Sequence, residues 1–181
     1  MPVVSCGMLL FDSKGVPVGV EGANPKPELV QHPPLRSPGP CPFPNPACLF
    51  RAEFVRERRI DVTLPRSEDF DFILPILLRY PSALWAEPLY AYLVPEAVRH
   101  RVHAESAAAA RRVYAKYARS YPFSSLFRQG ECLAKQAVYA AWARTSKAPR
   151  ALRRSARPLA AWEASTFEQE RAAVRAALAH L

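Results

Sequence analysis

The chain has 181 residues, of which half are hydrophobic, and 25 Lys and Arg against 16 Asp and Glu give it a formal net charge of +9. This length predicts one domain, or one domain with a helical appendage, with enough apolar residues for a core. No apolar run reaches the roughly 18 residues of a membrane span. We therefore expect a cytoplasmic chain, with a peripheral place at the inner face of a membrane left open.

The excess positive charge comes mainly from arginine, in runs at 56–59, 99–101 and 144–157. Such runs favour acidic partners, namely phosphates, nucleic acid or an anionic membrane surface, although solvated helix faces give the same pattern. The sequence has no zinc finger and no aromatic RNA-binding signature. Nucleic acid is therefore the less favoured partner.

The four cysteines, Cys6, Cys41, Cys48 and Cys132, match neither a C-x-x-C redox pair nor a zinc framework. We expect buried free thiols in a reducing compartment.

The first half of the chain predicts strands and a long loop. The apolar run Val3–Asp12 is turned by Ser13–Gly15 and followed by Val16–Val20, which predicts a hairpin or two edge strands. Nine prolines between Gly22 and Pro46 exclude a helix or a central strand there and predict a long loop.

The remainder predicts mainly helices. Leu49–Arg59 has a short helical pattern, and a second helix is expected from Ser67 to about Arg79. Ser82–Tyr92 predicts one or two short strands broken at Pro88. Three further helices are expected at Glu105–Tyr121, Glu131–Ala143 and Ala160–Leu181.

The stretch R-S-E-D-F-D-F, residues 66–72, holds three carboxylates within four residues. Ser67 is a suitable N-cap, and first-turn acids face the positive end of the helix dipole. Asp69 and Asp71 spell D-x-D, but residues two apart on a helix point about 200° apart and cannot easily share an ion. We interpret Asp71 as a solvated first-turn acid.

Three segments in order resemble the second half of family 2 glycosyltransferases. They are P-N-P-A-C-L-F-R-A-E-F-V-R-E-R-R-I, then L-P-R-S-E-D-F-D-F-I-L-P-I-L-L, and then A-E-P-L-Y-A-Y. The resemblance spans Pro2 to Ser106 and implies part of a GT-A fold, an α/β architecture. The activity it implies is transfer of a sugar from a nucleotide-sugar donor to a saccharide or lipid-linked acceptor.

The resemblance also implies roles for individual residues. Asp69 matches the family's general base, which takes the proton from the acceptor hydroxyl, and Glu68 is its neighbour. A helix N-terminus would keep that carboxylate ionised and fixed in direction.

The chain departs from the family pattern in several places. Leu93 stands where the family has an arginine after Y-x-Y, and Pro75 lies inside the helix, which predicts a kink or a late start. The family's divalent metal, Mg²⁺ or Mn²⁺, is held by a D-x-D before the matching region, and we find no such site here. We expect a truncated or inactive enzyme, or one whose donor-binding half is a separate polypeptide.

Other residues have candidate binding roles. Trp85 and Tyr92 could stack on an acceptor sugar together with Arg66, although strand alternation predicts that two of Trp85, Tyr90 and Tyr92 are core residues. A diphosphate could be bound by residues that follow the last predicted strand, namely Arg99, His100, Arg101 and His103.

The sequence therefore predicts an α/β chain. Residues 1–104, with the proline-rich loop at 22–46, form a partial GT-A-like transferase domain, and residues 105–181 form a helical region. The alternative is a non-enzymatic basic module that binds nucleic acid or an acidic partner through arginine-rich helices.

Overall fold

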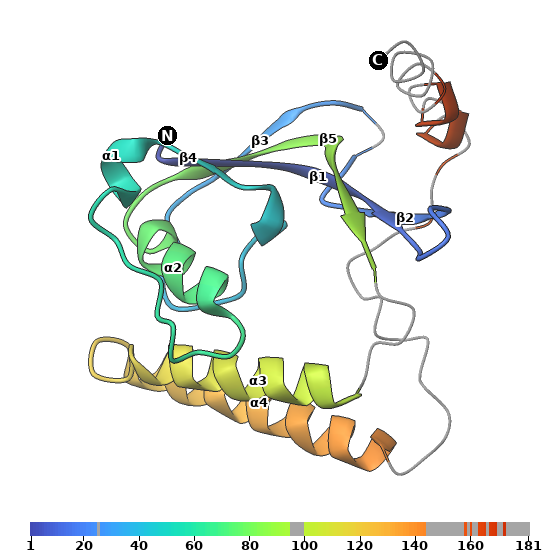
Figure 1. Cartoon of the computed structure of the whole chain (residues 1–181). Helices are drawn as coiled ribbons and strands as arrows, with labels where there is room; N and C mark the ends of the chain where they lie inside the picture. The colour runs from blue at the N-terminus through green and yellow to red at the C-terminus, as the bar shows by residue number, and fades with distance from the viewer. Residues whose placement is uncertain are drawn as a thin grey trace.

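The computed structural model describes residues 1–24, 26–94 and 100–143, and in the C-terminal region residues 158, 160, 163–165, 167–169 and 172. Five strands, one short 3-10 turn and four helices are defined in these parts (Figure 1). In chain order they are β1 (Val3–Phe11), β2 (Pro17–Glu21), β3 (Leu29–His32), η1 (Asn45–Ala47), β4 (Leu49–Phe50), α1 (Ala52–Val55), α2 (Glu68–Leu77), β5 (Ser82–Leu93), α3 (His100–Ala115) and α4 (Pro122–Ala143).

The strands form one curled mixed sheet in the order β2-β1-β5-β3, and β4 also pairs with β1. β1 and β5 are parallel neighbours, whereas β2, β3 and β4 each pair antiparallel with them. A parallel pair requires a long crossover, and here the crossover contains three strands and the helices α1 and α2. The predicted α/β class is therefore confirmed.

The predicted N-terminal hairpin is confirmed as β1 and β2. Asp12 turns the chain, because its carboxylate Oδ1 accepts hydrogen bonds from the backbone N–H groups of Lys14, at 3.0 Å, and Val16, at 2.8 Å. Gly15 lies in the turn at φ 73°, a conformation that glycine adopts without strain.

β5 is one strand of 12 residues, so the predicted break at Pro88 is wrong. The pairing with β1 shifts register there instead, since Cys6 faces Trp85 while Gly7 faces Pro88. Gly7 is needed at this point, because a Cβ on it would lie 2.9 Å from the carbonyl oxygen of Glu87. The proline is tolerated because the strand bulges around it.

The proline-rich region also contains regular structure that the sequence did not predict. β3 pairs antiparallel with β5, with Leu29 opposite Trp85 and His32 opposite Ser82. β3 holds no proline and lies at the edge of the sheet, where a neighbouring proline costs no ladder hydrogen bond.

The predicted helix at Leu49–Arg59 is also wrong. Leu49 and Phe50 form β4 against Val3 and Val4, and only the four residues of α1 are helical. An isolated helix of about ten residues has little stability of its own, and Leu49 and Phe50 make backbone pairs with β1 instead of helical hydrogen bonds.

α2 is the central helix of the core, and its start agrees with the prediction. Its apolar positions Phe70, Ile73, Leu74, Ile76 and Leu77 are buried in the main hydrophobic cluster. Of the two consequences predicted for Pro75, the late start is wrong, because α2 begins at Glu68 and Pro75 lies within it.

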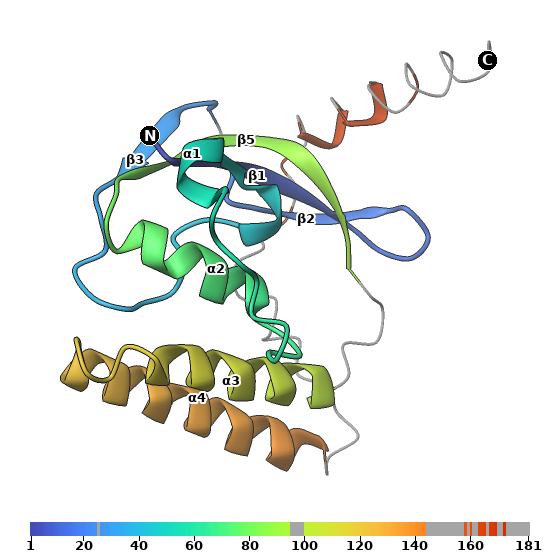
Figure 2. The same ribbon diagram turned by 60° about the vertical axis from the view of Figure 1, so that its left-hand side comes forward.

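α3 and α4 form an antiparallel hairpin below α2 (Figures 1 and 2). α3 begins five residues before the predicted start and ends earlier, while α4 begins at Pro122, nine residues before its predicted start. Proline is favourable in the first helical turn, where its missing N–H has no partner to lose.

The hairpin shares the core of the sheet, because Val113, Tyr114 and Cys132 belong to the same cluster as Val3 and Leu74. In the C-terminal region residues 163–165 and 167–169 are helical, and Phe167 packs on Phe11 with ring centroids 4.8 Å apart. Within the rest of the helix predicted at 160–181, residue 172 is helical and residue 160 is not, and the other residues lie outside the described parts of the chain. No helix in the described residues is both long and apolar enough to cross a membrane.

Candidate active site at the start of helix α2

Ser67 does not cap α2 through its side chain, so the predicted N-cap hydrogen bond is wrong. Ser67 has the left-handed conformation, at φ 60° and ψ 21°, and its Oγ donates instead to the carbonyl of Ser106 in α3, at 3.4 Å. An N-cap serine normally has extended backbone, which aims its oxygen at the helix N–H groups. The left-handed backbone of Ser67 turns the hydroxyl toward α3.

Arg66 is also tied to α3. Its Nε lies 3.5 Å from the carboxylate of Glu105, which also accepts a 2.8 Å hydrogen bond from Nε of Arg101. The hydrogen bond from Arg101, helped by Arg66, lowers the pKa of Glu105. Arg66 and Arg101, two of the three arginines that were predicted to bind substrate or diphosphate, therefore share one acidic partner.

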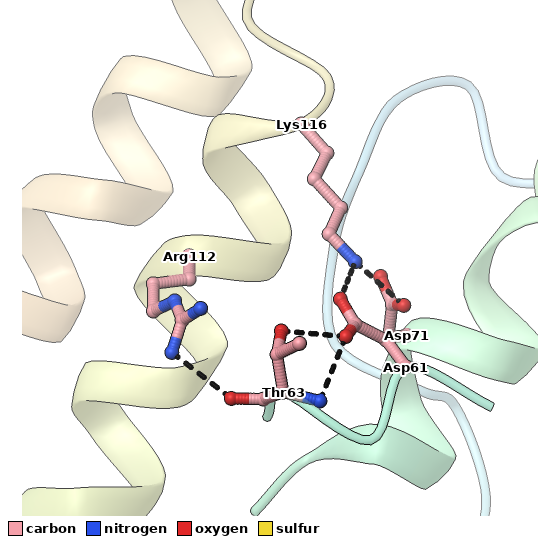
Figure 3. Close-up of polar contacts among 5 residues, drawn as sticks. All are labelled: Asp61, Thr63, Asp71, Arg112 and Lys116. Atoms are coloured by element: carbon pink, nitrogen blue, oxygen red, sulfur yellow. Dashed lines mark hydrogen bonds and ion pairs between the residues drawn. The ribbon is translucent and has the colours of Figure 1, made fainter. Parts of the chain in front are cut away.

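Asp71 is an ion-paired residue and not the solvated acid that was predicted. Its side chain is only 15% exposed, and it accepts a 2.7 Å hydrogen bond from Nζ of Lys116, which also reaches Asp61 at 2.8 Å (Figure 3). Asp61 in turn accepts hydrogen bonds from the N–H and Oγ1 of Thr63, at 3.0 and 2.6 Å. Arg112 donates to the carbonyl of Thr63 at 3.3 Å.

These contacts shift two pKa values. The hydrogen bond from Lys116, followed by those from Thr63, lowers the pKa of Asp61 well below its usual range. Partial burial opposes the charge on Lys116, but its hydrogen bonds to Asp61 and Asp71 outweigh this and raise its pKa. Asp61 and Lys116 thus stay charged near neutral pH, and we interpret the cluster as a structural link between α2 and α3.

Asp69 differs from Asp71 in both exposure and ion pairing. Its side chain is exposed, and no cation among the described residues lies within ion-pair distance of it. Oδ1 accepts the N–H of Phe70 at 2.7 Å, and Oδ2 accepts a long hydrogen bond from Nδ2 of Asn45 in η1, at 3.4 Å. Glu68, beside it, is half-buried. Asp69 is therefore the one acid of the first turn that is open to a ligand.

The two cysteines whose pKa values are influenced by Asp69, Cys41 and Cys48, are not reactive thiols. Burial raises the pKa of Cys41 to about 12 and that of Cys48 to about 11, and the negative charge of Asp69 adds a smaller increase to each. All four cysteines are free. Thiols with such pKa values remain protonated at neutral pH and are poor nucleophiles. Free thiols are as predicted, although only Cys132 is fully buried.

Asn45 joins this site through η1. The turn is fixed to β1, because Oγ of Ser5 donates to the carbonyl of Pro44 at 2.8 Å, and Ser5 is buried. The Oδ1 atom of Asn45 is buried and has no hydrogen-bond partner among the described residues. Asn45 was not predicted, since the sequence shows only a P-N-P turn, 24 residues before Asp69.

The aromatic residues of β5 are not core residues, so that expectation is wrong. Trp85, Tyr90 and Tyr92 are 36%, 40% and 39% exposed. Leu84 points into the core, and alternation along a strand therefore places Trp85 on the opposite face of the sheet, away from α2. The indole N–H of Trp85 donates to Glu87 at 2.9 Å on that face. Trp85 and Asp69 do not form one site.

The proposed diphosphate-binding residues are not gathered at Asp69 either. His103 stacks on Tyr139 of α4, with ring centroids 5.1 Å apart, and Arg101 is paired with Glu105. The side chains of Arg99 and His100 lie outside the described residues. His103 therefore contributes to the contact between α3 and α4.

Among the described residues no group of three or more His, Cys, Asp or Glu side chains is placed to hold a metal ion. The two acids of D-F-D bond in different directions, Asp69 to Asn45 and Asp71 to Lys116. These residues do not fit the divalent ion that the family resemblance implies.

Comparison with known proteins gives no family. The chain matches no known family model, no curated protein and no solved structure.

Proposed function

We propose that this chain is the acceptor side of a GT-A-like family 2 glycosyltransferase, with Asp69 as general base. The proposal rests on one observation: Asp69 is the only acid of the first turn of α2 that is exposed and free of a cation among the described residues. The family resemblance assigns the catalytic role to the same residue.

The direction of α2 relative to the strands of the sheet supports this proposal. α2 runs antiparallel to β5, so its first turn faces the side toward which β1 and β5 run (Figure 1). In α/β sheets ligands bind beyond the carboxyl ends of parallel strands. Asp69 therefore lies on the side of the fold where a substrate would be expected.

The chemistry requires a carboxylate that is ionised and held in one direction. Oδ1 of Asp69 is fixed by the N–H of Phe70, and Asp69 lies in the first turn of α2, at the positive end of the helix dipole. As the acceptor oxygen attacks the anomeric carbon, its proton passes to Asp69, the new C–O bond forms and the bond to the nucleoside diphosphate breaks. The amide of Asn45 would orient Oδ2.

The proposal covers the acceptor side alone. The described residues offer no ion site for a sugar nucleotide, so the donor would be held by other residues, including those of a separate polypeptide. The acceptor would be a saccharide or a lipid-linked sugar.

A transfer assay tests this proposal. A panel of radiolabelled nucleotide sugars is incubated with Mg²⁺ or Mn²⁺, saccharide and lipid-linked acceptors, and the wild-type, Asp69→Asn or Asp71→Asn chain. We expect Asp69→Asn to reduce transfer at least 100-fold, because general-base catalysis contributes about 10²- to 10⁴-fold. Asp71→Asn is the matched control, and we expect it to lower the melting temperature but not turnover per folded molecule.

Equal turnover by wild type and Asp69→Asn would refute the assignment of the base. If no nucleotide sugar is consumed or raises the melting temperature, and the chain binds DNA with a steep salt dependence, the basic-module alternative is correct.

A further inference from the structure

The face of α4 that points away from α3 is apolar and exposed along its whole length. α4 lies on the side of α3 that is remote from the sheet (Figures 1 and 2). Its inner positions, including Ser125 and Cys132, are buried. Phe123, Leu126 and Phe127 are 89%, 71% and 64% exposed, so these large side chains lie outside the core that the described residues form.

The outer face has no charged residue. Positions at helical spacing, which all lie on one side of α4, are exposed: Phe123, Leu126, Phe127, Gly130, Leu133, Ala134, Ala137, Val138, Ala140 and Ala141. Two charged residues lie beside this face: Lys135, which is exposed, and Glu131, whose side chain is 37% exposed and paired with Arg128. An apolar stripe of about 28 Å, at 1.5 Å per residue, is larger than a soluble monomer usually leaves in water.

We propose that this outer face of α4 binds the same face of a second copy of the chain, with the two α4 helices antiparallel. The inference does not depend on the proposed enzymatic activity. It is based on the distribution of side-chain size on the outer face: the most exposed large residues, Phe123, Leu126 and Phe127, lie in the first half of the helix. The second half has four alanines beside Leu133 and Val138.

An antiparallel pair centred near residue 132 places each bulky half against the small half of its partner. Phe123 then faces Ala141, Phe127 faces Ala137, and Gly130 faces Ala134. Large side chains opposite small ones let helices approach closely. With α3 of each copy behind its α4, the assembly is a four-helix bundle, a common arrangement for antiparallel helix hairpins.

Charge favours a second copy over a membrane. Helices that lie on a membrane surface carry several Lys or Arg residues beside the apolar face. On α4, Arg128 is already paired with Glu131 at 2.6 Å, which leaves Lys135 alone. An uncharged face, in contrast, can be buried against itself without leaving any charge unpaired.

One helix from each copy gives an interface at the small end of the usual range, so we expect a dissociation constant in the micromolar range. The two chains also repel each other, because each carries a formal charge of +9. Salt screens this repulsion, so the dimer should become tighter as the salt concentration rises.

Sedimentation velocity from about 1 to 200 μM, in 50 and 500 mM NaCl, tests the proposal on the full chain. We expect dimers that increase with concentration and salt, and at least a 10-fold weaker association for Phe127→Glu. Gln129→Glu makes the same charge change two residues away, at a half-buried flank, and should dimerise like wild type. Circular dichroism establishes that each variant is folded.

A pair of complementary variants tests the antiparallel register. Phe127→Lys and Ala137→Glu should each fail to dimerise alone, whereas a mixture should form a heterodimer, because the new lysine of one copy faces the new glutamate of the other. If the mixture stays monomeric while wild type dimerises, the register is wrong.

A wild-type chain that is monomeric at 200 μM in both salts would overturn the proposal. Such a monomer could instead sediment with vesicles of anionic lipid but not with vesicles of zwitterionic lipid. If that binding is lost at high salt, the outer face of α4 binds a membrane surface and not a second copy.

Discussion

Lys116 connects two acids that are far from it in the sequence. Its Nζ lies 2.7 Å from Asp71 in α2 and 2.8 Å from Asp61 in the preceding loop, so one ammonium group holds both segments against α3. The same contacts take Asp71 out of the candidate site and leave Asp69 as the open acid.

Replacement of Lys116 should destabilise the fold. Lys116→Met keeps the length of the side chain but leaves both carboxylates without their cation, and Asp71 is mostly covered. Hydrogen bonds to charged groups contribute about 1.5–3 kcal/mol, and less when they are half exposed, so we expect a loss on the order of 1 kcal/mol. Urea denaturation measures this change. Lys135→Met is the matched control. A change of more than about 0.5 kcal/mol in its free energy of unfolding would contradict the interpretation.

Asp61 should make stability depend on pH in acid. Its folded pKa is lowered, so its contribution is present above the unfolded pKa of about 4 and is lost as the pH falls toward the folded value. We expect the free energy of unfolding of wild type to fall between pH 5 and 2 more steeply than that of Asp61→Asn. Parallel curves for the two proteins, from urea titrations at each pH, would show that Asp61 is not linked to folding.

At the scale of elements, the register shift between β1 and β5 depends on one glycine. Gly7 faces the bulge at Glu87 and Pro88, where a Cβ would approach the backbone carbonyl oxygen of Glu87 to 2.9 Å. Backbone atoms of two paired strands cannot move aside as a flexible side chain would.

Gly7→Ala should therefore be destabilising, by about 1–3 kcal/mol, as for other overpacked sites. Gly130→Ala is a suitable comparison, because a Cβ there meets nothing within 4 Å and alanine favours the helix. In thermal unfolding we expect the melting temperature to fall for Gly7→Ala and to rise for Gly130→Ala. An unchanged melting temperature for Gly7→Ala would mean that the bulge relaxes freely.

Elements with a strong local signal were predictable. The β1–β2 hairpin and the start of α2 follow from turn residues and from apolar spacing. β3 and β4 could not be predicted, because each is a short segment whose formation depends on a partner strand far away in the sequence. The start of α4 could not be predicted, because a proline such as Pro122 can end one helix or stand in the first turn of the next.

The candidate site was predicted only in part. Glu68 and Asp69 could be found because they stand next to each other before an apolar helix. Asn45 and Lys116 could not, since they lie 24 and 45 residues from their partners in α2 and nothing local marks them. The outward position of Trp85 depends on which face of β5 meets α2, and only the packed structure determines that.

At the scale of the whole molecule, the sheet and the helical hairpin have one core. Val113, Tyr114 and Cys132 pack in the same cluster as the buried side chains of α2, and the rings of Phe70 and Tyr114 meet edge to face at 5.4 Å. Two of the links between α2 and α3 also cross the predicted boundary at residue 104, since Ser67 bonds to Ser106 and Asp71 to Lys116.

A chain that ends at residue 104 should therefore fail to fold cooperatively. It would expose the lower side of α2, including Phe70, and each large apolar side chain left in water costs about 1.5–3 kcal/mol. Losses at several such positions approach the whole stability of a domain, which is about 5–15 kcal/mol. A chain that ends at residue 143 retains both helices and is the matched control. In thermal melts followed by circular dichroism we expect a sharp transition for the control and a broad, shallow one for the shorter chain. A sharp transition for residues 1–104 would show that the sheet and α2 are stable without the hairpin.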